Sequence, residues 1–270
     1  MPPSQIIPSL VDKGIYIASE SSFYRILRKE GQLKHRGKAK PRTRVKPEPY
    51  VATGSNQVWT WDITYLPTSV KGSFYYLYMI MDIFSRKIVG WEIYEKQTDE
   101  LASVVARKAY LSERIGGKDL VLHSDNGSPM KGATMLATLQ TLGVAASFSR
   151  PSVSNDNPYS EALFRTLKYK PGYPVKPFES LEASRVWTLK FVRWYNEEHK
   201  HSSLKFVSPV IRHSGKDKDI LKQREEVYEE ARKRNPIRWS GKVRNWEASK
   251  EVSLNPMKKN DKNTNIEKAA

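Results

Sequence analysis

Apolar and polar residues alternate along residues 57–67, "QVWTWDITYLP", and this period of two predicts a half-buried strand. Trp59, Trp61 and Ile63 share one face of that strand, and Asp62 lies on the other. Residues 73–84, "SFYYLYMIMDIF", are almost wholly apolar, which indicates a strand covered on both faces. Residues 88–95, "IVGWEIYE", form a third apolar run after a short polar turn. Short connections between successive strands predict an antiparallel meander.

The next part of the chain switches between helical and strand patterns. A helix is expected from Thr98, as N-cap, to a stop at Gly116. Residues 119–125 and 144–149 read as strands on either side of a helix at 128–143, and such a unit is normally parallel and right-handed. The sum is an α/β fold with a mixed five-stranded sheet flanked by helices.

Helical patterns follow the sheet. One runs from Asn157 to Lys168 and ends before Pro171, which cannot continue it. Another spans residues 180–199, "SLEASRVWTLKFVRWYNEEH". Its aromatic side chains are expected to pack in the core and not to bind a ligand; they are Trp187, Phe191 and Trp194.

The first 33 residues read as two short helices joined by a turn, which fits a partial helix-turn-helix segment that binds DNA. Such a unit usually needs a third helix, so the chain is expected to lack an N-terminal portion. Residues 34–56 form a basic linker in which cations occupy alternate positions: Lys34, Arg36, Lys38, Lys40, Arg42, Arg44 and Lys46. Either the segment is a flexible charged linker or it also contacts phosphates. We favour the second alternative, with DNA contacts from Lys38, Lys40, Arg42 and Arg44.

Charge supports a polyanionic partner. The formal net charge is +17, made up of +7 in residues 1–56, +2 in residues 57–170 and +8 in residues 171–270. A nearly neutral core between basic ends favours nucleic acid, although plain solubility would also explain a basic protein. The C-terminal extension at 213–256 is basic, and its residues 234–246 alternate cations with aromatics. They form either a strand pair that grips DNA or a small appendage packed on the core. Residues 257–270 are expected to be disordered.

Several classes of protein are disfavoured. The chain has no cysteine, which rules out disulfides and thiolate metal sites and fits a reducing compartment. No apolar run approaches the roughly 20 residues that span a bilayer, and the N-terminus lacks the apolar segment of a signal peptide. We therefore expect a soluble cytoplasmic protein without a membrane partner.

Three carboxylates stand out by their context. Asp62 lies in the first strand, Asp125 ends the fourth strand at an Asn-Gly turn, and Glu161 lies near the start of a helix. Carboxylates brought together repel one another, and a divalent cation is the simplest compensation. Oxygen ligands favour Mg²⁺ or, in its place, Mn²⁺, and two such ions about 4 Å apart would serve phosphoryl transfer.

Other polar residues near these carboxylates have simpler interpretations. Asp82 is expected to cap a turn, with a metal role as the less favoured alternative. His123 either packs with hydrogen bonds or contacts DNA or metal-bound water. Asp156 is interpreted as solvated in a loop. Arg165 and Lys168 are candidates for lining a DNA groove, although their helical spacing forces neither side chain onto the site.

The segments "WTWDITYLP", "HSDNGSPM" and "NDNPYSEALFRTLKY" strongly resemble the catalytic core of retroviral integrases and bacterial insertion-sequence transposases. That family carries an Asp, an Asp and a Glu with 35 residues between the last two, as between Asp125 and Glu161. It often has a basic residue seven positions after the Glu, where Lys168 stands. The segment "YNEEHKHSSLKFVSPVIRH" resembles the region that follows the core, and the best match is the second-reading-frame product of a frameshifted transposase.

The resemblance implies a ribonuclease-H-like catalytic core over residues 57–212, with Asp62, Asp125 and Glu161 as catalytic and metal-binding residues. It also implies DNA strand cleavage and strand transfer at the ends of an insertion sequence, on double-stranded DNA and by a homo-oligomer. Two alternatives stay open. One is a non-catalytic DNA-binding regulator or partner of a longer transposase, and the other is a ribonuclease acting on hybrids, which leaves the basic ends unexplained.

Overall fold

The computed structural model describes residues 3–33, 50–150, 156–170 and 172–255, and the chain divides into two units, Met1–Val45 and Lys46–Ala270. The candidate DNA contacts of the linker, Lys38, Lys40, Arg42 and Arg44, lie outside the described residues. So do the flanking cations of the same row and the tail at 257–270. None of the described helices is long and apolar enough to cross a membrane.

The N-terminal unit contains the two expected helices, α1 (Pro3–Val11) and α2 (Glu20–Lys29), which contact each other. Ser19 is the N-cap of α2, where its side chain accepts a hydrogen bond from the Ser22 amide. Helix α2 has no buried residue. The two helices are therefore confirmed, and their assignment to a helix-turn-helix stays a prediction.

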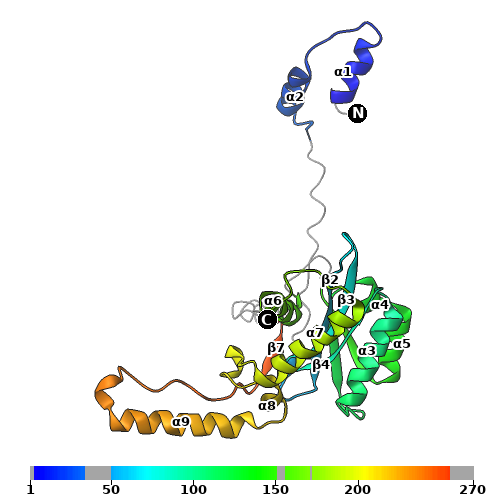
Figure 1. Cartoon of the computed structure of the whole chain (residues 1–270). Helices are drawn as coiled ribbons and strands as arrows, with labels where there is room; N and C mark the ends of the chain where they lie inside the picture. Colours follow the sequence, from blue (N-terminus) through cyan, green and yellow to red (C-terminus); the bar gives the residue numbers. More distant parts are fainter. Residues whose placement is uncertain (1–2, 34–49, 151–155, 171, 256–270) are drawn as a thin grey trace, which may run out of the picture. The chain divides into compact units, whose positions relative to one another are not determined.

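A mixed five-stranded sheet forms the centre of the second unit (Figure 1). Its strand order is β4-β3-β2-β5-β6. The first three strands in sequence pair antiparallel, whereas β5 pairs parallel with both β2 and β6. The bounds are Val58–Pro67 for β2, Phe74–Asp82 for β3, Ile88–Tyr94 for β4, Leu120–Ser124 for β5 and Val144–Phe148 for β6. The α/β fold predicted from the hydrophobic pattern is confirmed.

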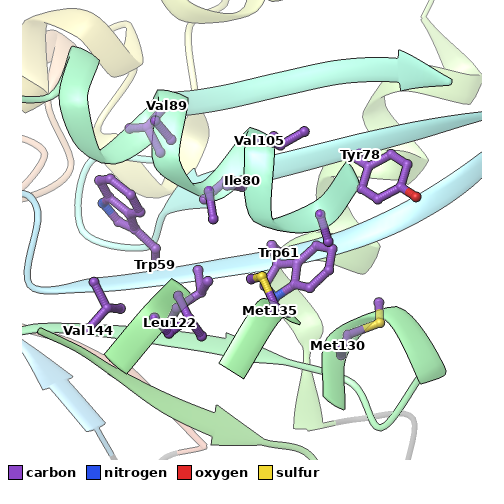
Figure 2. Packing of buried hydrophobic residues seen from close by; sticks show 14 of the residues in the cluster. Trp59, Trp61, Tyr78, Ile80, Val89, Val105, Leu122, Met130, Met135 and Val144 are labelled. Atoms are coloured by element: carbon purple, nitrogen blue, oxygen red, sulfur yellow. The ribbon is translucent and has the colours of Figure 1, made fainter. Parts of the chain in front are cut away.

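Helices cover both faces of this sheet, which explains the continuous apolar run of β3. On one face Trp59, Trp61 and Ile80 pack in a single cluster with α3 (Asp99–Ser112) and α5 (Ala133–Thr141), as Figure 2 shows at close range. On the other face Leu77 and Met79 pack with α6 (Pro158–Tyr169) and α7 (Leu181–Arg193). The second cluster includes Trp187, Phe191 and Trp194, so these aromatics pack as expected.

Three helices depart from the expected bounds. Helix α3 ends at Ser112, and the chain turns at Arg114 with a φ of 52°, before the predicted stop at Gly116. The helix expected at 128–143 is broken into α4 (Ser128–Lys131) and α5 by Gly132, where a Cβ would collide with the Asp99 side chain. Asp99 accepts a hydrogen bond from the Thr134 amide at 3.0 Å, so this close approach fixes the start of α5. The helix expected at 180–199 ends as α7 at Arg193 and continues as a π-helical turn, Trp194–Glu198.

The C-terminal extension packs on the core. After a 3₁₀ turn at Ser202–Leu204 it forms α8 (Pro209–His213), α9 (Asp217–Arg234) and a second 3₁₀ turn at Pro236–Arg238. Its last strand, β7 (Val252–Leu254), pairs antiparallel with β1 (Tyr50–Ala52) from the end of the predicted linker. Trp246 is buried in a cluster with Leu204, Val207 and Leu221. No strand forms within the described residues 234–246, so the structure disagrees with a strand pair. Trp239 and Trp246 pack against Tyr228 of α9, and most of residues 234–245 are exposed.

A charged network ties α8 to the sheet. Asp82 is fully buried and accepts hydrogen bonds from the amide and hydroxyl of Ser85, so it caps the β3–β4 turn as expected. The imidazole of His213 lies 2.8 Å from the Ser85 hydroxyl through Nδ1 and 2.9 Å from Glu113 Oε2 through Nε2. Glu113 also accepts a hydrogen bond from Lys87 Nζ at 2.7 Å.

The network shifts two pKa values in opposite directions. Burial by itself lowers the pKa of His213, but hydrogen bonding and charge from Asp82 and Glu113 raise it overall above 6.5. Burial by itself raises the pKa of Glu113, but hydrogen bonds from His213 and Lys87 lower it to about 2. The stabilisation from charged His213 is therefore complete below pH 6.5 and is lost as pH rises through its folded pKa. The stabilisation from Glu113 is present above pH 4.5 and is lost as pH falls towards 2.

We expect His213→Gln to lower the free energy of unfolding by about 1–3 kcal/mol at pH 6, because it removes hydrogen bonds from a buried network. The loss should shrink as the pH is raised towards 9, through the raised pKa of His213 in the parent protein. Chemical unfolding of both proteins at several pH values measures this difference. His199→Gln is the matched control: burial lowers the pKa of His199, so its effect should not grow on acidification. A His213→Gln loss that is equal at pH 6 and pH 9 would contradict the assignment.

Candidate active site

The pairing of β2 with β5 brings two of the predicted carboxylates together. The two strands are parallel, and Trp61 is the register partner of Ser124. Asp62 and Asp125 are the next residues along the chain from that pair, so they lie side by side where β5 ends, with Asp62 in the middle of β2. Carboxyl ends of parallel strands are where sites collect in open sheets of this kind. The strand pattern predicted a mixed sheet but not this register, which makes the two residues neighbours.

Asp125 is held by the loop after β6. The Ser149 hydroxyl donates a hydrogen bond of 2.6 Å to Asp125 Oδ1, and the Ser149 amide donates one of 2.9 Å to the Ser124 carbonyl. The side chain of Asn126 donates to the Ser149 carbonyl. Gly127 is the N-cap of α4 with an ordinary φ of −63°, and a Cβ there would lie 2.6 Å from Met130 Sδ, so a larger residue would displace the Met130 side chain. These contacts orient the Asp125 carboxylate while leaving its Oδ2 without a hydrogen bond among the described residues.

Glu161 reaches the same region because the start of α6 is anchored to β2. Asn157 is fully buried and donates a hydrogen bond of 3.2 Å from its side chain to the Trp61 carbonyl, directly before Asp62. The Thr60 hydroxyl donates to Asn157 Oδ1 and lies 3.0 Å from the Ser160 hydroxyl. Glu161 lies in the first turn of the helix that these bonds position.

The three carboxylates share one electrostatic environment. Burial raises the pKa of Asp62 to about 7, and the negative charges of Asp125 and Glu161 contribute to that rise. A hydrogen bond from the Ile63 amide and the positive charge of Lys168 oppose it. Burial and the charge of Asp125 also raise the pKa of Glu161. Mutual repulsion of this kind favours protonation of the carboxylates or the binding of a cation between them.

The donor set fits a hard divalent cation. All three candidate ligands are carboxylates, and none of them forms an ion pair with a cationic side chain among the described residues. Within the same residues, no three His, Cys, Asp or Glu side chains are arranged as a finished metal site. The three carboxylates are therefore near enough to shift one another's pKa values. To bind one ion together, their side chains must move closer to one another than they lie in this structure. Oxygen donors of this type suit Mg²⁺ or Mn²⁺ better than zinc.

Two nearby polar residues are structural. His123 is buried, and its ring lies 2.9 Å from the Ser147 hydroxyl and 3.0 Å from the Asp156 carbonyl, so the packed interpretation is confirmed. The expectation that Asp156 is solvated was wrong. Asp156 is buried and accepts hydrogen bonds of 2.8–2.9 Å from the backbone and guanidinium of Arg150, which lower its pKa. Its partner lies six residues earlier in the chain, and nothing in the sequence pattern marks the pair.

The two candidate groove residues on α6 differ in surroundings. Lys168 lies seven positions after Glu161, two helical turns along, and its charge acts on Asp62. Arg165 lines a separate cavity beside α6. Their contact with DNA stays a prediction. The residues that sequence reasoning missed are the supporting ones, Ser149, Asn157 and Thr60. The Asn-Pro pair at the helix start is a turn signal that could have pointed to Asn157, which was predicted only as a helix boundary.

Comparison with known proteins places this site in a family. Residues 52–154 and residues 142–209 each match an integrase core domain family. The chain is 33% identical over 166 residues to the transposase for insertion sequence element IS904 of Lactococcus lactis, covering 59% of this chain and 62% of that protein. It is 30% identical over 161 residues to transposase InsF for insertion sequence IS3A of Escherichia coli, covering 59% of this chain and 54% of that protein. The chain thus spans little more than half the length of these relatives.

Solved structures give more distant similarities. One is the simian T-cell lymphotropic virus intasome in complex with PP2A regulatory subunit B56 gamma, with a TM-score of 0.47, 17% identity and coverage of 78% of this chain and 74% of that chain. Another is the HTLV-2 integrase catalytic core domain in complex with magnesium, with a TM-score of 0.42, 20% identity and coverage of 59% and 97%.

The two domain matches together span residues 52–209, the five-stranded sheet with α3 to α7. This part of the chain is an integrase core domain. The chain belongs to the integrase core domain family over these residues, and the relatives named above are insertion-sequence transposases.

We expect Asn157→Ala to lower the free energy of unfolding by about 1–3 kcal/mol, because it removes two buried hydrogen bonds, one with the Thr60 hydroxyl and one with the Trp61 carbonyl. It should also weaken Mn²⁺ binding measured by titration calorimetry, since the start of α6 is no longer held beside Asp62. Asn196→Ala is the matched control: Asn196 makes two backbone hydrogen bonds to Ile88, away from the carboxylates. Equal loss of Mn²⁺ affinity in both variants would show that Asn157 acts only through general stability.

Proposed function

We propose that this chain is a transposase that cleaves DNA at the ends of an insertion sequence and joins them to a new site. The observation that carries the proposal is the β2–β5 register, which makes Asp62 and Asp125 neighbours, with α6 anchored beside them so that Glu161 shares their electrostatic field. The integrase core family to which the chain belongs supports it. So do the names of the relatives, insertion-sequence transposases of two bacteria.

In this proposal Asp62, Asp125 and Glu161 hold two Mg²⁺ ions, or Mn²⁺ in their place. Such ions activate an attacking oxygen and stabilise a leaving one in phosphoryl transfer. The chain's own residues set up that chemistry. Ser149 orients Asp125 through its 2.6 Å hydrogen bond, and burial keeps Asp62 in surroundings that favour a bound cation over an unpaired charge. Lys168 adds a positive charge close to Asp62, where a phosphate would also be attracted.

The reaction proceeds in two in-line displacements at phosphorus. Water attacks the phosphodiester at the end of the element, and the bond to the 3′ oxygen breaks, which leaves a free 3′-hydroxyl and a 5′-phosphate. That hydroxyl then attacks a second phosphodiester, forming a new bond to phosphorus while another 3′ oxygen leaves. Neither step needs a nucleophilic side chain, because positioning and charge stabilisation supply the rate enhancement.

The proposed partner is double-stranded DNA, both as element end and as target. The net charge of +17, concentrated outside residues 57–170, suits a polyanion. Two ends must be joined in one event, so we infer that the chain works as a homo-oligomer on DNA. The candidate contacts in the core are Arg165 and Lys168, both exposed on α6.

We expect Asp125→Asn to abolish Mg²⁺-dependent cleavage and strand transfer, by at least about 100-fold, because it removes charge where the cations bind. Binding to the same DNA should be unchanged. The assay uses the full chain with duplex DNA that carries the sequences flanking its gene. Asp119→Asn is the matched control, since Asp119 is exposed at the opposite end of β5.

Retained cleavage in Asp125→Asn would remove this residue from the mechanism. A parent chain that binds the DNA but never cleaves it, with either metal, would favour the alternative of a DNA-binding regulator that partners a longer transposase.

A further inference from the structure

A cavity of about 510 Å³ lies beside α6, outside the group of three carboxylates. Its walls come from α6, the end of β3 with the β3–β4 turn, and the segment from Tyr195 to Ser203. Three cationic side chains line it, Arg86, Arg165 and Lys200, and no described Asp or Glu does. None of these cations has an ion-pair partner among the described residues. A cavity with this charge suits an anion.

Arg86 is held in place before any ligand arrives. It lies in the β3–β4 turn with a φ of 64°, and its amide donates a 2.8 Å hydrogen bond to the Asp82 carbonyl. Its guanidinium lies over the Tyr159 ring at 4.0 Å from the centroid. The buried Nε has no hydrogen-bond partner in the described structure, which is costly for a charged donor and indicates a missing acceptor. A guanidinium fixed by stacking is suited to the two-point recognition of phosphate.

Neutral polar groups complete the walls. The rings of His199 and His201 lie 5.6 Å apart, and Ser203 Oγ is 2.9 Å from His201 Nδ1. Burial lowers the pKa of His201 to about 4, with a contribution from the charge of Arg86, and burial lowers the pKa of His199. Both histidines are therefore neutral near pH 7. They add hydrogen-bonding capacity without adding a charge that would repel the three cations.

We propose that this cavity binds a phosphodiester group of the DNA strand that runs from the cleavage site along α6. The inference rests on the proposed function, because α6 is the element that both regions share. Glu161 and Arg165 are four residues apart, about 6 Å along the helix axis, so a strand bound at the first is within reach of the second. The apolar part of the wall, Met81, Leu163 and Tyr195, suits the sugar that accompanies a phosphate in a polynucleotide.

The test measures binding of a fluorescent DNA duplex to the full chain by anisotropy, at several salt concentrations, with EDTA present so that no cleavage occurs. We expect Arg86→Gln to weaken binding by roughly tenfold, as loss of a charge-assisted contact does. The slope of log affinity against log salt should fall by about one, as for one lost phosphate contact. Lys200→Gln, an exposed substitution with little effect on folding, should reduce the slope in the same direction. The matched control is Arg107→Gln, which removes the same charge from exposed Arg107 on α3, a helix that packs on the opposite face of the sheet.

The outcomes separate the possible sources of the phosphate. If Arg86→Gln and Lys200→Gln both bind DNA as the parent does, the proposal is overturned, and the proposed function is untouched. If they lose binding of inorganic phosphate in calorimetry and keep DNA binding, the cavity takes a free phosphate, and the DNA assignment is again overturned. If Arg86→Gln fails to fold by circular dichroism, Lys200→Gln decides between these results. A parent chain that binds no DNA would instead argue against the proposed function itself.

Discussion

The β2–β5 pairing places two negatively charged side chains side by side, and much of the surrounding structure limits the loss of stability that their repulsion causes. Asp62 and Asp125 come directly after the last register pair of two parallel strands, and Glu161 adds a third negative charge to the same field. Isolated carboxylates in partly buried surroundings would lower stability through lost hydration and repulsion. The three neighbouring carboxylates therefore lower the stability of the folded chain. The same negative charge attracts cations to this site.

The supporting contacts make this arrangement possible because they come from neutral groups. Ser149 bonds Asp125, and Asn157 bonds the backbone next to Asp62, so geometry is fixed without cancelling the negative charge. Arg150, which would cancel it, is instead held by Asp156 in a separate pair. The positive charge that acts on Asp62 is that of Lys168, at the far end of α6 from Glu161. The carboxylates of the site are therefore held in place while their negative charge is not neutralised. The cavity beside α6 is instead lined by positively charged side chains.

The sequence predicted the sheet well because strand patterns report burial directly. The unbroken apolar run of β3 corresponds to a strand covered on one side by α3 and α5 and on the other by α6 and α7. The alternation in β2 underestimated its burial, because Thr60 and Thr64 on the polar face are buried as well. The sequence also predicted that Asp62, Asp125 and Glu161 form the site, from their positions in or beside strands and helices and from the family resemblance. It missed what depends on tertiary proximity: the break at Gly132 comes from the approach of Asp99, and the burial of Asp156 comes from Arg150. It also gave no sign that His213 joins Asp82 and Glu113, since three distant segments contribute to that network.

The two-stranded ribbon of β1 and β7 has a mechanical consequence. Tyr50 pairs with Leu254 and Ala52 with Val252, so the chain enters the core and leaves it at the same end of the ribbon. Tension applied between the start of β1 and the end of β7 would load these three pairs one after another, as a zipper is opened, and not all at once in shear. Such a ribbon yields at low force. The load would then pass to the hydrogen bonds that tie the end of β7 to the start of α6, from the Tyr159 hydroxyl to the Ser253 carbonyl and from the Asn255 side chain to the Asp156 carbonyl.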